Sequence, residues 1–381
     1  MSNLEPLPFS RLPVAPRAAA VCVSTSCRDD EWDRFVAGSA HGFHEQTGAW
    51  SEVKAFYGWK PLRVTLHDSK GVIAGTQILF RAVRGGLRVG YASRGPVVSS
   101  ADPELMARMV EEMGHAARAE GVSYLAVTPP YGGDAAEHAL RARGFRTKPR
   151  SLPPGSVMTA TLLIDLARDL DTIQAQLRMQ VRQHIRLAQR RGVVVRQGDR
   201  EDVETFRRLM GALCERRGIS PTPPEKDFFE NLWAVFAPRG WVRIFLAEVE
   251  GEPVAALLVF TFGDTARVWK AGWSGHYQDR RPNNLLYWEA IRWANDNGFR
   301  YFDLVGIERE LALQLLRGEA MDWTPVAGPD NFKVGYGGAP VLLPETFYRF
   351  LNPGPRFLLA MGGRRLLESS RVAHLLERLS T

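Results

Sequence analysis

Residues 242–260 read VRIFLAEVEGEPVAALLVF, and a similar pattern stands 180 positions earlier, in residues 62–80, as LRVTLHDSKGVIAGTQILF. In both stretches two runs rich in aliphatic residues flank a turn that contains a glycine, Gly71 or Gly251. Short apolar runs on either side of such a turn are typical of a β-hairpin. Each stretch is therefore predicted to form a strand, a turn and a second strand.

The similarity continues downstream at a nearly constant offset. A further apolar segment, a helix with apolar residues at three-to-four spacing and a last short apolar run follow each hairpin. These segments are 87–93, 103–119 and 120–127 after the first hairpin, and 266–274, 283–297 and 297–305 after the second. Such internal repetition indicates a duplicated structural unit. The predicted fold class is α/β (α+β): two tandem domains, each with a mixed or antiparallel sheet flanked by helices.

Length and composition agree with two domains, because the chain has 381 residues, of which 45% are hydrophobic. The net charge of +7 permits an anionic partner such as RNA, a nucleotide sugar or a membrane surface, without choosing among them. Cys22, Cys27 and Cys214 lack the spacing of metal ligands, so we expect no metal site. Three such cysteines suit a reducing compartment, and no apolar run has transmembrane length, so we expect a cytoplasmic location.

A basic helix is predicted between the two repeats, within residues 171–198. Its apolar stripe and its arginines lie mostly on different sides. The stripe consists of Leu177, Val181, Ile185 and Ala188, and the arginines are Arg178, Arg182, Arg186, Arg190 and Arg191. The arginines either form an ordinary solvated surface or face phosphates.

Six motifs in a fixed order resemble the Fem aminoacyltransferases over residues 40–345. They are HEQTGAWSEVKAFYGWKP (44–61), YASRGPVV (91–98), MQVRQHIRLAQRRGVVV (179–195), CERRGIS (214–220), YFDLVGIE (301–308) and NFKVGYGG (331–338). The resemblance implies two domains of the GNAT acyltransferase fold. It also implies transfer of an amino acid from aminoacyl-tRNA, as co-substrate and without a further cofactor, to an amine on a peptidoglycan precursor. No long heptad hairpin interrupts the chain, which makes it more similar to FemX than to FemA.

The domain boundaries follow from the repeat and the resemblance. Residues 1–39 are predicted to be an N-terminal extension with the first helix. Residues 40–157 and 338–381 are predicted to form the first GNAT-like domain, on the acceptor side, and 158–337 the second, on the donor side. The Leu- and Arg-rich tail, 356–379, either packs on the first domain or contacts a membrane surface.

The resemblance also implies functional residues. Lys333 and Phe332 are predicted to be catalytic, with Lys333 in a glycine-flanked loop and its ammonium directed at the oxyanion or at the tRNA end. Of the 49 basic residues only seven are lysines, so a lysine here stands out. Lys54 and Arg216 are predicted to bind acceptor phosphates, with Arg217 as the neighbouring alternative. The remaining predicted substrate-binding residues are Tyr91, Arg94, Thr128, Lys270 and Asp303.

Three alternatives remain at this stage. Thr128 stands where FemX-like proteins carry an acidic residue, so a small-molecule amine is an alternative acceptor. The chain could also be a CoA-dependent N-acyltransferase, but the segment at 276–290, HYQDRRPNNLLYWEA, has no glycine to cradle a pyrophosphate, and Pro282 lacks an amide donor. The third alternative is a non-catalytic protein that binds RNA or a membrane surface. No DNA partner is expected. The sequence contains no G-x-S-x-G motif, so we expect no serine nucleophile of that type.

Overall fold

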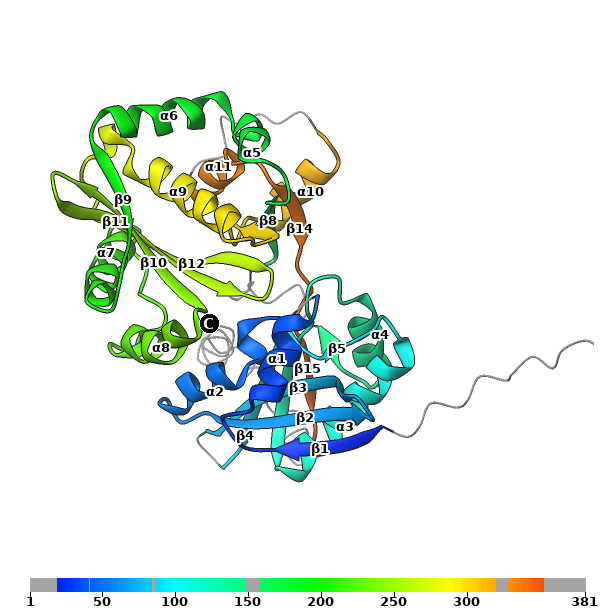
Figure 1. The fold of residues 1–381 in the computed structure, drawn as a ribbon. Coiled ribbons are helices and arrows are strands. Elements are labelled where there is room, and N and C mark those ends of the chain that lie inside the picture. Colours follow the sequence, from blue (N-terminus) through cyan, green and yellow to red (C-terminus); the bar gives the residue numbers. More distant parts are fainter. Residues whose placement is uncertain (1–18, 41, 84–85, 148–157, 320–327, 353–381) are drawn as a thin grey trace, which may run out of the picture.

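The computed structural model describes residues 19–352 except 41, 84–85, 148–157 and 320–327. Two mixed sheets, each flanked by helices, follow one another along the chain (Figure 1). None of the helices in this described part combines the length and apolar character needed to cross a bilayer.

The first sheet has the strand order β1-β2-β3-β4-β6-β15-β7, with β5 beside β3. Its pairs are antiparallel except β4 and β6, which are parallel. Its strands are β1 (Ala20–Ser24), β2 (Lys60–Asp68), β3 (Gly71–Ala82), β4 (Arg88–Ser93), β5 (Val97–Val98), β6 (Val122–Thr128), β7 (Arg146–Thr147) and β15 (Phe347–Phe350). The accompanying helices are α1 (Asp30–Gly38), η1 (His44–Gln46), α2 (Gly48–Ala55), α3 (Pro103–Ala119) and α4 (Asp134–Ala142).

The second sheet has the order β14-β8-β13-β12-β11-β10-β9, and β12 and β13 are its parallel pair. Its strands are β8 (Ala160–Asp165), β9 (Val193–Gln197), β10 (Val242–Val249), β11 (Glu252–Phe262), β12 (Thr265–Trp273), β13 (Tyr301–Asp303) and β14 (Ala339–Leu342). Its helices are α5 (Leu170–Gln176), α6 (Met179–Arg190), α7 (Asp202–Arg216), α8 (Phe228–Phe236), η2 (Ala237–Arg239), η3 (Gln278–Arg280), α9 (Pro282–Asp296), α10 (Arg309–Leu316) and α11 (Pro329–Val334).

The predicted duplication is confirmed, and so is the fold class. The elements β2, β3, β4, α3 and β6 recur in the same order as β10, β11, β12, α9 and β13. In both units the strand after the long helix pairs in parallel with the last strand of the preceding meander. This agreement follows from local signals, since hairpins and amphipathic helices are encoded by short-range periodicity.

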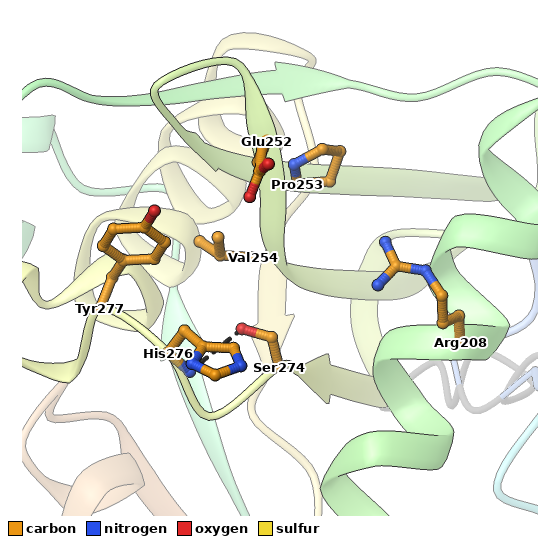
Figure 2. A pocket seen from close by; sticks show the side chains of 7 residues that line it. All are labelled: Arg208, Glu252, Pro253, Val254, Ser274, His276 and Tyr277. Carbon is orange, nitrogen blue, oxygen red and sulfur yellow. Dashed lines mark hydrogen bonds between the residues drawn. The ribbon is translucent and has the colours of Figure 1, made fainter.

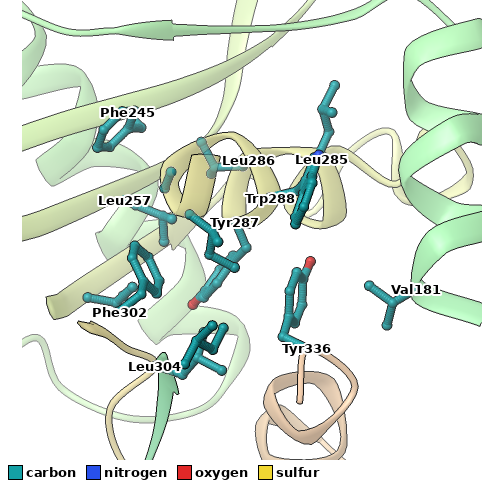
Figure 3. Packing of buried hydrophobic residues seen from close by; sticks show 14 of the residues in the cluster. Val181, Phe245, Leu257, Leu285, Leu286, Tyr287, Trp288, Phe302, Leu304 and Tyr336 are labelled. Atoms are coloured by element: carbon teal, nitrogen blue, oxygen red, sulfur yellow. The ribbon is translucent and has the colours of Figure 1, made fainter. Parts of the chain in front are cut away.

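Helices cover both faces of the second sheet, so its central strands are apolar on both sides. In β10, Phe245 faces the cluster around α9, whereas its neighbours Ile244 and Leu246 face the cluster around α7 and α8. Figure 3 shows the first of these clusters, in which the α9 side chains Leu286 and Tyr287 belong to the same core as Phe302. The alternation places α9 on one face and α7 on the other.

Strand pairing differs from the predicted boundaries at two points. The strand β1, inside the predicted N-terminal extension, pairs with β2 and extends the first sheet. The strand β14, predicted to belong to the first domain, pairs with β8 of the second sheet, and only β15 returns to the first. The predicted boundary at 157/158 borders the undescribed residues 148–157, and the whole predicted tail, 356–379, lies outside the described residues.

One aromatic cluster belongs to both domains. Trp50 of α2 makes edge contacts with Phe228 and Phe236 of α8 and with Trp269 of β12, at centroid distances of 6.2 Å in each case. Between the domains, the buried His44 ring stacks on Phe260 of β11 at 3.6 Å. The two units therefore share a hydrophobic core at their interface.

Candidate functional site

The cavity of interest opens where β12 and β13 separate. The two strands pair only from Thr265 to Arg267 and from Tyr301 to Asp303. Beyond this point β12 continues beside β11. The segment after β13 turns away from it through Val305, whose φ is 54°. Positive φ is rare for a β-branched residue and requires support from its surroundings. Here Asp303 Oδ1 accepts a hydrogen bond from the Val305 amide at 2.9 Å.

The cavity between the separated strands has a volume of about 250 Å³. Its lining comes from α7 and the loop after it, from β12, from α9, from the turn after β13 and from α11. The lining residues are Met210, Leu213, Cys214, Arg217, Ile219, Ser220, Thr222, Val268, Trp269, Lys270, Ala271, Tyr287, Leu304, Val305, Pro329 and Lys333. Three of them are cationic, and no carboxylate or histidine is among these described residues.

Lys333 reaches the cavity from α11. Its ammonium donates hydrogen bonds to the carbonyl oxygens of Val305 and Gly306, the latter at 2.5 Å. An ammonium has three N–H donors, so one remains for a ligand. Burial lowers the pKa of Lys333, while Asp330 and Asp303 act in the opposite direction. The sequence prediction of a loop at Lys333 is wrong, because Lys333 lies in the short helix α11, which Gly328 precedes and Gly335 follows.

Lys270 and Arg217 are the other two cations at the cavity. Burial lowers the pKa of Lys270 to about 8, and its ammonium lies 3.4 Å from the Thr222 hydroxyl oxygen. Arg217 caps the C-terminus of α7, where its main chain meets the last carbonyls of the helix. Its side chain is exposed. Three predicted site residues, Lys333, Lys270 and Arg217, are thus brought together.

Cys214 is the only thiol in the lining, and burial raises its pKa. A thiol needs a lowered pKa to act as a nucleophile near neutral pH. With no histidine beside it in the described lining, Cys214 is a packing residue rather than a catalytic one. The cavity offers positive charge and hydrogen-bond donors, not a covalent nucleophile.

Lys54 lies at the domain interface and is only 7% exposed. Its ammonium is 5.0 Å from the Trp50 ring centroid and 5.5 Å from that of Phe228. Burial lowers its pKa to about 8, against the attraction of Glu225 and Glu45. No residue in the described part of the chain accepts a hydrogen bond from it, so its positive charge is available to an anionic ligand.

The side chains of the neighbouring residues Arg216 and Arg217 lie in different surroundings. The Arg216 guanidinium lies 4.2 Å from the Trp273 ring centroid and donates to the Trp273 carbonyl oxygen at 2.9 Å. It does not line the cavity, whereas Arg217 does. Of the two arginines, only Arg217, the alternative in the sequence prediction, faces the cavity.

Asp303 is fully buried and holds the base of the cavity together. Its carboxylate accepts hydrogen bonds from Arg267 Nε at 2.8 Å, from the Tyr131 hydroxyl at 3.0 Å and from the Thr161 hydroxyl. Tyr131 belongs to the first domain, so this contact joins the two domains. With these partners and no exposure, Asp303 shapes the turn that holds Lys333 and does not itself meet a substrate.

The remaining predicted residues lie outside the cavity lining. Tyr91 is buried against Trp59, and burial raises its pKa. The Thr128 hydroxyl is 2.8 Å from that of Thr346, on the loop that leads into β15. Phe332 packs on Tyr287 at 5.0 Å, in the core of the second domain.

Arg94 is also buried, at the interface between the domains. Its guanidinium lies over the rings of Phe43 and Tyr131, at 5.3 and 5.1 Å. Its φ of 54° and its position 4.0 Å from a Glu45 oxygen fix the turn after β4. This packing makes Arg94 a component of the interface.

Sequence reasoning missed the carbonyl groups of Val305 and Gly306 and the aromatic surroundings of Lys54. The carbonyls matter because they orient the Lys333 ammonium, and the aromatic rings matter because they exclude water from Lys54. A β-branched residue at the end of the predicted strand, directly before a glycine, was a signal for the first. No local signal exists for the second, since Trp50 and Phe228 come from different domains.

A larger hollow of about 680 Å³ lies elsewhere on the second domain (Figure 2). It is lined by Arg208, Glu252, Pro253, Val254, Ser274, His276 and Tyr277. Ser274 accepts a hydrogen bond from the main-chain amide of His276 at 3.2 Å, and among the described residues the His276 imidazole makes no hydrogen bond with the Ser274 hydroxyl. None of the predicted site residues lines this hollow. Among the described residues, no group of three or more His, Cys, Asp or Glu side chains could hold a metal ion.

The start of α9 is a poor cradle for a pyrophosphate. The helix begins at Pro282, which has no amide hydrogen, and the Asn284 amide already donates to the Arg281 carbonyl oxygen at 3.0 Å. Anion binding at a helix start relies on free amide groups. The first turn of α9 offers few of them.

Comparisons with known proteins agree with this architecture. The family described as "FemAB family" matches residues 27–143, and the one described as "Acetyltransferase (GNAT) domain" matches residues 175–320. A crystal structure of FemX has a TM-score of 0.75 at 20% identity, over 89% of this chain and 98% of that chain. At that identity the likeness establishes the tandem GNAT-like fold.

Two curated relatives are similar in sequence. The chain is 28% identical over 300 residues to the UDP-N-acetylmuramoylpentapeptide-lysine N(6)-alanyltransferase of Weissella viridescens, covering 74% of this chain and 84% of that protein. It is 27% identical over 234 residues to the lipid II:glycine glycyltransferase of Staphylococcus saprophyticus, covering 59% of this chain and 56% of that protein. Both relatives are named as transferases of an aminoacyl group.

Proposed function

The chain belongs to the Fem family of the GNAT superfamily, and we propose that it transfers an aminoacyl group from aminoacyl-tRNA to an amine of a peptidoglycan-precursor peptide. The observation that carries the proposal is the cavity at the strand separation. It combines Lys333, Lys270 and Arg217 with a described lining that has no carboxylate or histidine. Such a cavity suits a reaction whose substrate is already activated and whose transition state is anionic.

An aminoacyl ester meets that requirement. The acceptor amine attacks the ester carbonyl carbon, a C–N bond forms, and the C–O bond to the ribose breaks. The amine loses a proton and the departing ribose oxygen gains one, so no enzyme nucleophile and no covalent enzyme intermediate are needed. What the protein supplies is alignment and stabilisation of the tetrahedral oxyanion. The free N–H of the Lys333 ammonium supplies the stabilising charge.

The acceptor is proposed to carry a diphosphate, as in a UDP-linked or lipid-linked precursor. Lys54 supports this proposal, because a buried cation with no hydrogen-bond acceptor among the described residues is costly unless a ligand provides the counter-charge. Arg217, which lines the cavity and has an exposed side chain, suits a phosphate through its planar fork. A small-molecule amine without phosphate is the alternative acceptor.

The test is a transfer assay with mass detection. The protein is incubated with total charged tRNA and with a panel of amines: a UDP-linked muropeptide, a lipid-linked muropeptide, the same peptide without phosphate, and simple amines. A gain of one aminoacyl mass on a peptide acceptor, absent with uncharged tRNA, supports the proposal. No gain on any acceptor, together with acetyl transfer from acetyl-CoA, would contradict it.

A further inference from the structure

The helix α6 carries a row of arginines without acidic neighbours. Arg182, Arg186 and Arg190 follow Arg178, the N-cap residue, at intervals of four, and α6 contains no Asp or Glu. Residues four apart lie next to each other on a helix surface. From Arg182 to Arg190 the row extends for about 12 Å, with about 6 Å of rise between successive members.

The row is unfavourable for the isolated fold. The side chains of Arg182, Arg186 and Arg190 form no hydrogen bond or ion pair with any residue that the structure describes. Like charges at four-residue spacing destabilise a helix. The first members also sit at the N-terminal end of α6, where the helix dipole disfavours cations. Three adjacent arginines without counter-charge indicate a polyanionic partner that supplies it.

The row begins beside the proposed active site. The Arg178 guanidinium donates to Asn331 Oδ1 of α11 at 2.7 Å, and the Arg178 amide donates to the Gly335 carbonyl oxygen at 2.9 Å. The same helix, α11, carries Lys333. From there α6 runs along α9 on the outer side of the second domain (Figure 1). A polyanionic chain that leaves the Lys333 cavity on this side would therefore meet Arg182, Arg186 and Arg190 in turn.

We infer that Arg182, Arg186 and Arg190 bind the phosphate backbone of the acceptor arm of the donor tRNA, an inference that rests on the proposed function. Nucleic acid presents about one phosphate per 3.4 Å of duplex axis on each strand, so the row is long enough to follow several of them. A membrane surface fits less well. The apolar side of α6, Val181, Ile185 and Ala188, is buried, and on α6 only Met179 is a large exposed apolar residue. A helix that binds a bilayer needs its apolar side free.

The experiment compares the full-length wild-type protein with two triple variants. The test variant is R182Q/R186Q/R190Q, and glutamine keeps the helix propensity. The matched control is R34Q/R118Q/R141Q, which removes the same charge from α1, α3 and α4 of the first domain. The affinity for uncharged total tRNA is measured from low to moderate salt, and transfer is measured with full-length aminoacyl-tRNA and with an aminoacylated CCA trinucleotide.

We expect the affinity of the test variant for tRNA to be lower by about tenfold or more at low salt. The magnitude of the slope of log K against log salt should decrease by about two, which corresponds to the loss of three phosphate contacts. The control should stay within about twofold of wild type. Transfer from full-length tRNA should fall more than transfer from the trinucleotide, which has too few phosphates to follow the row. Thermal unfolding should show the test variant at least as stable as the wild type, because repulsion is removed.

The outcomes separate this inference from the proposed function. If the test variant binds tRNA like the control, or if only its affinity for phosphatidylglycerol vesicles falls, the inference is wrong even when transfer proceeds. If the wild type binds no tRNA, the inference is wrong as well. If the wild type transfers from neither donor, the proposed function fails, while the tRNA affinities and salt slopes still decide whether α6 binds RNA.

Discussion

Replacing Lys333 by methionine tests the proposed chemistry most directly. The side chain keeps its length but loses all three donors. Two of these hold the carbonyls of Val305 and Gly306, and the third is free for the oxyanion. Removing one oxyanion donor lowers kcat by about 10²- to 10³-fold, or about 3–4 kcal/mol. Two carbonyls without a donor should lower the free energy of unfolding by about 1–3 kcal/mol, so we expect a folded but less stable protein.

The assay is single-turnover transfer from purified aminoacyl-tRNA, with tRNA affinity and thermal unfolding measured on the same sample. Lys70, exposed in the turn between β2 and β3, provides the control variant Lys70→Met. Affinity for tRNA should stay within a few-fold, because the lost interaction develops in the transition state. Lys333→Arg should rescue poorly, since a planar fork does not reproduce three diverging donors. Wild-type kcat in Lys333→Met would refute the reasoning and leave Lys333 with a purely structural role.

Four further outcomes are expected. Lys54→Met should raise the KM for a diphosphate acceptor, yet stabilise the free protein at pH 7 by roughly 3 kcal/mol, since the pKa of Lys54 is about 8 instead of 10.5. That gain in stability is complete below pH 8 and disappears towards pH 10.5, because the folded chain releases the Lys54 proton at a lower pH than the unfolded chain does. Chemical denaturation from pH 7 to 10.5 measures the gain, and a Lys54→Met variant less stable than the wild type at pH 7 would contradict the expectation. Arg217→Gln should raise the same KM about tenfold or more, and Arg216→Gln much less; equal effects in the kinetic assay would reverse the assignment. Asp303→Asn should lower both the melting temperature and kcat while the KM for tRNA changes little, and unchanged kcat would separate Asp303 from the active site. Acetyl-CoA should give no product with any of the amines, and acetyl transfer that a CoA analogue inhibits would contradict this expectation.

The sequence predicts the fold better than the site, and the reason is physical. Hairpins and amphipathic helices depend on neighbours a few positions away, which is why both repeated units are visible in the sequence. The pairing of β14 with β8 depends on residues that are far apart in the chain, and the sequence prediction placed β14 with the wrong sheet.

The same distinction applies to the site residues. Lys333, Lys270 and Arg217 meet at one cavity, although the three come from separate elements. Which of Arg216 and Arg217 faces the cavity depends on how α7 ends, and the helix at Lys333 begins with Pro329 after Gly328, a start signal that the glycine-rich run obscured. The role of Asp303 depends on partners from both domains and is visible only in the folded chain.

The paths of β14 and β15 determine how the duplicated chain can be divided. The last described strand of the second sheet is followed, only a few residues later, by a strand inserted between β6 and β7 of the first. A fragment that ends before residue 158 therefore lacks β15 of the first sheet, and a fragment that runs from 158 to 352 carries β15 without its partner strands. A cut between the two repeats leaves the first sheet incomplete, so the first repeat is not a separable module of the chain.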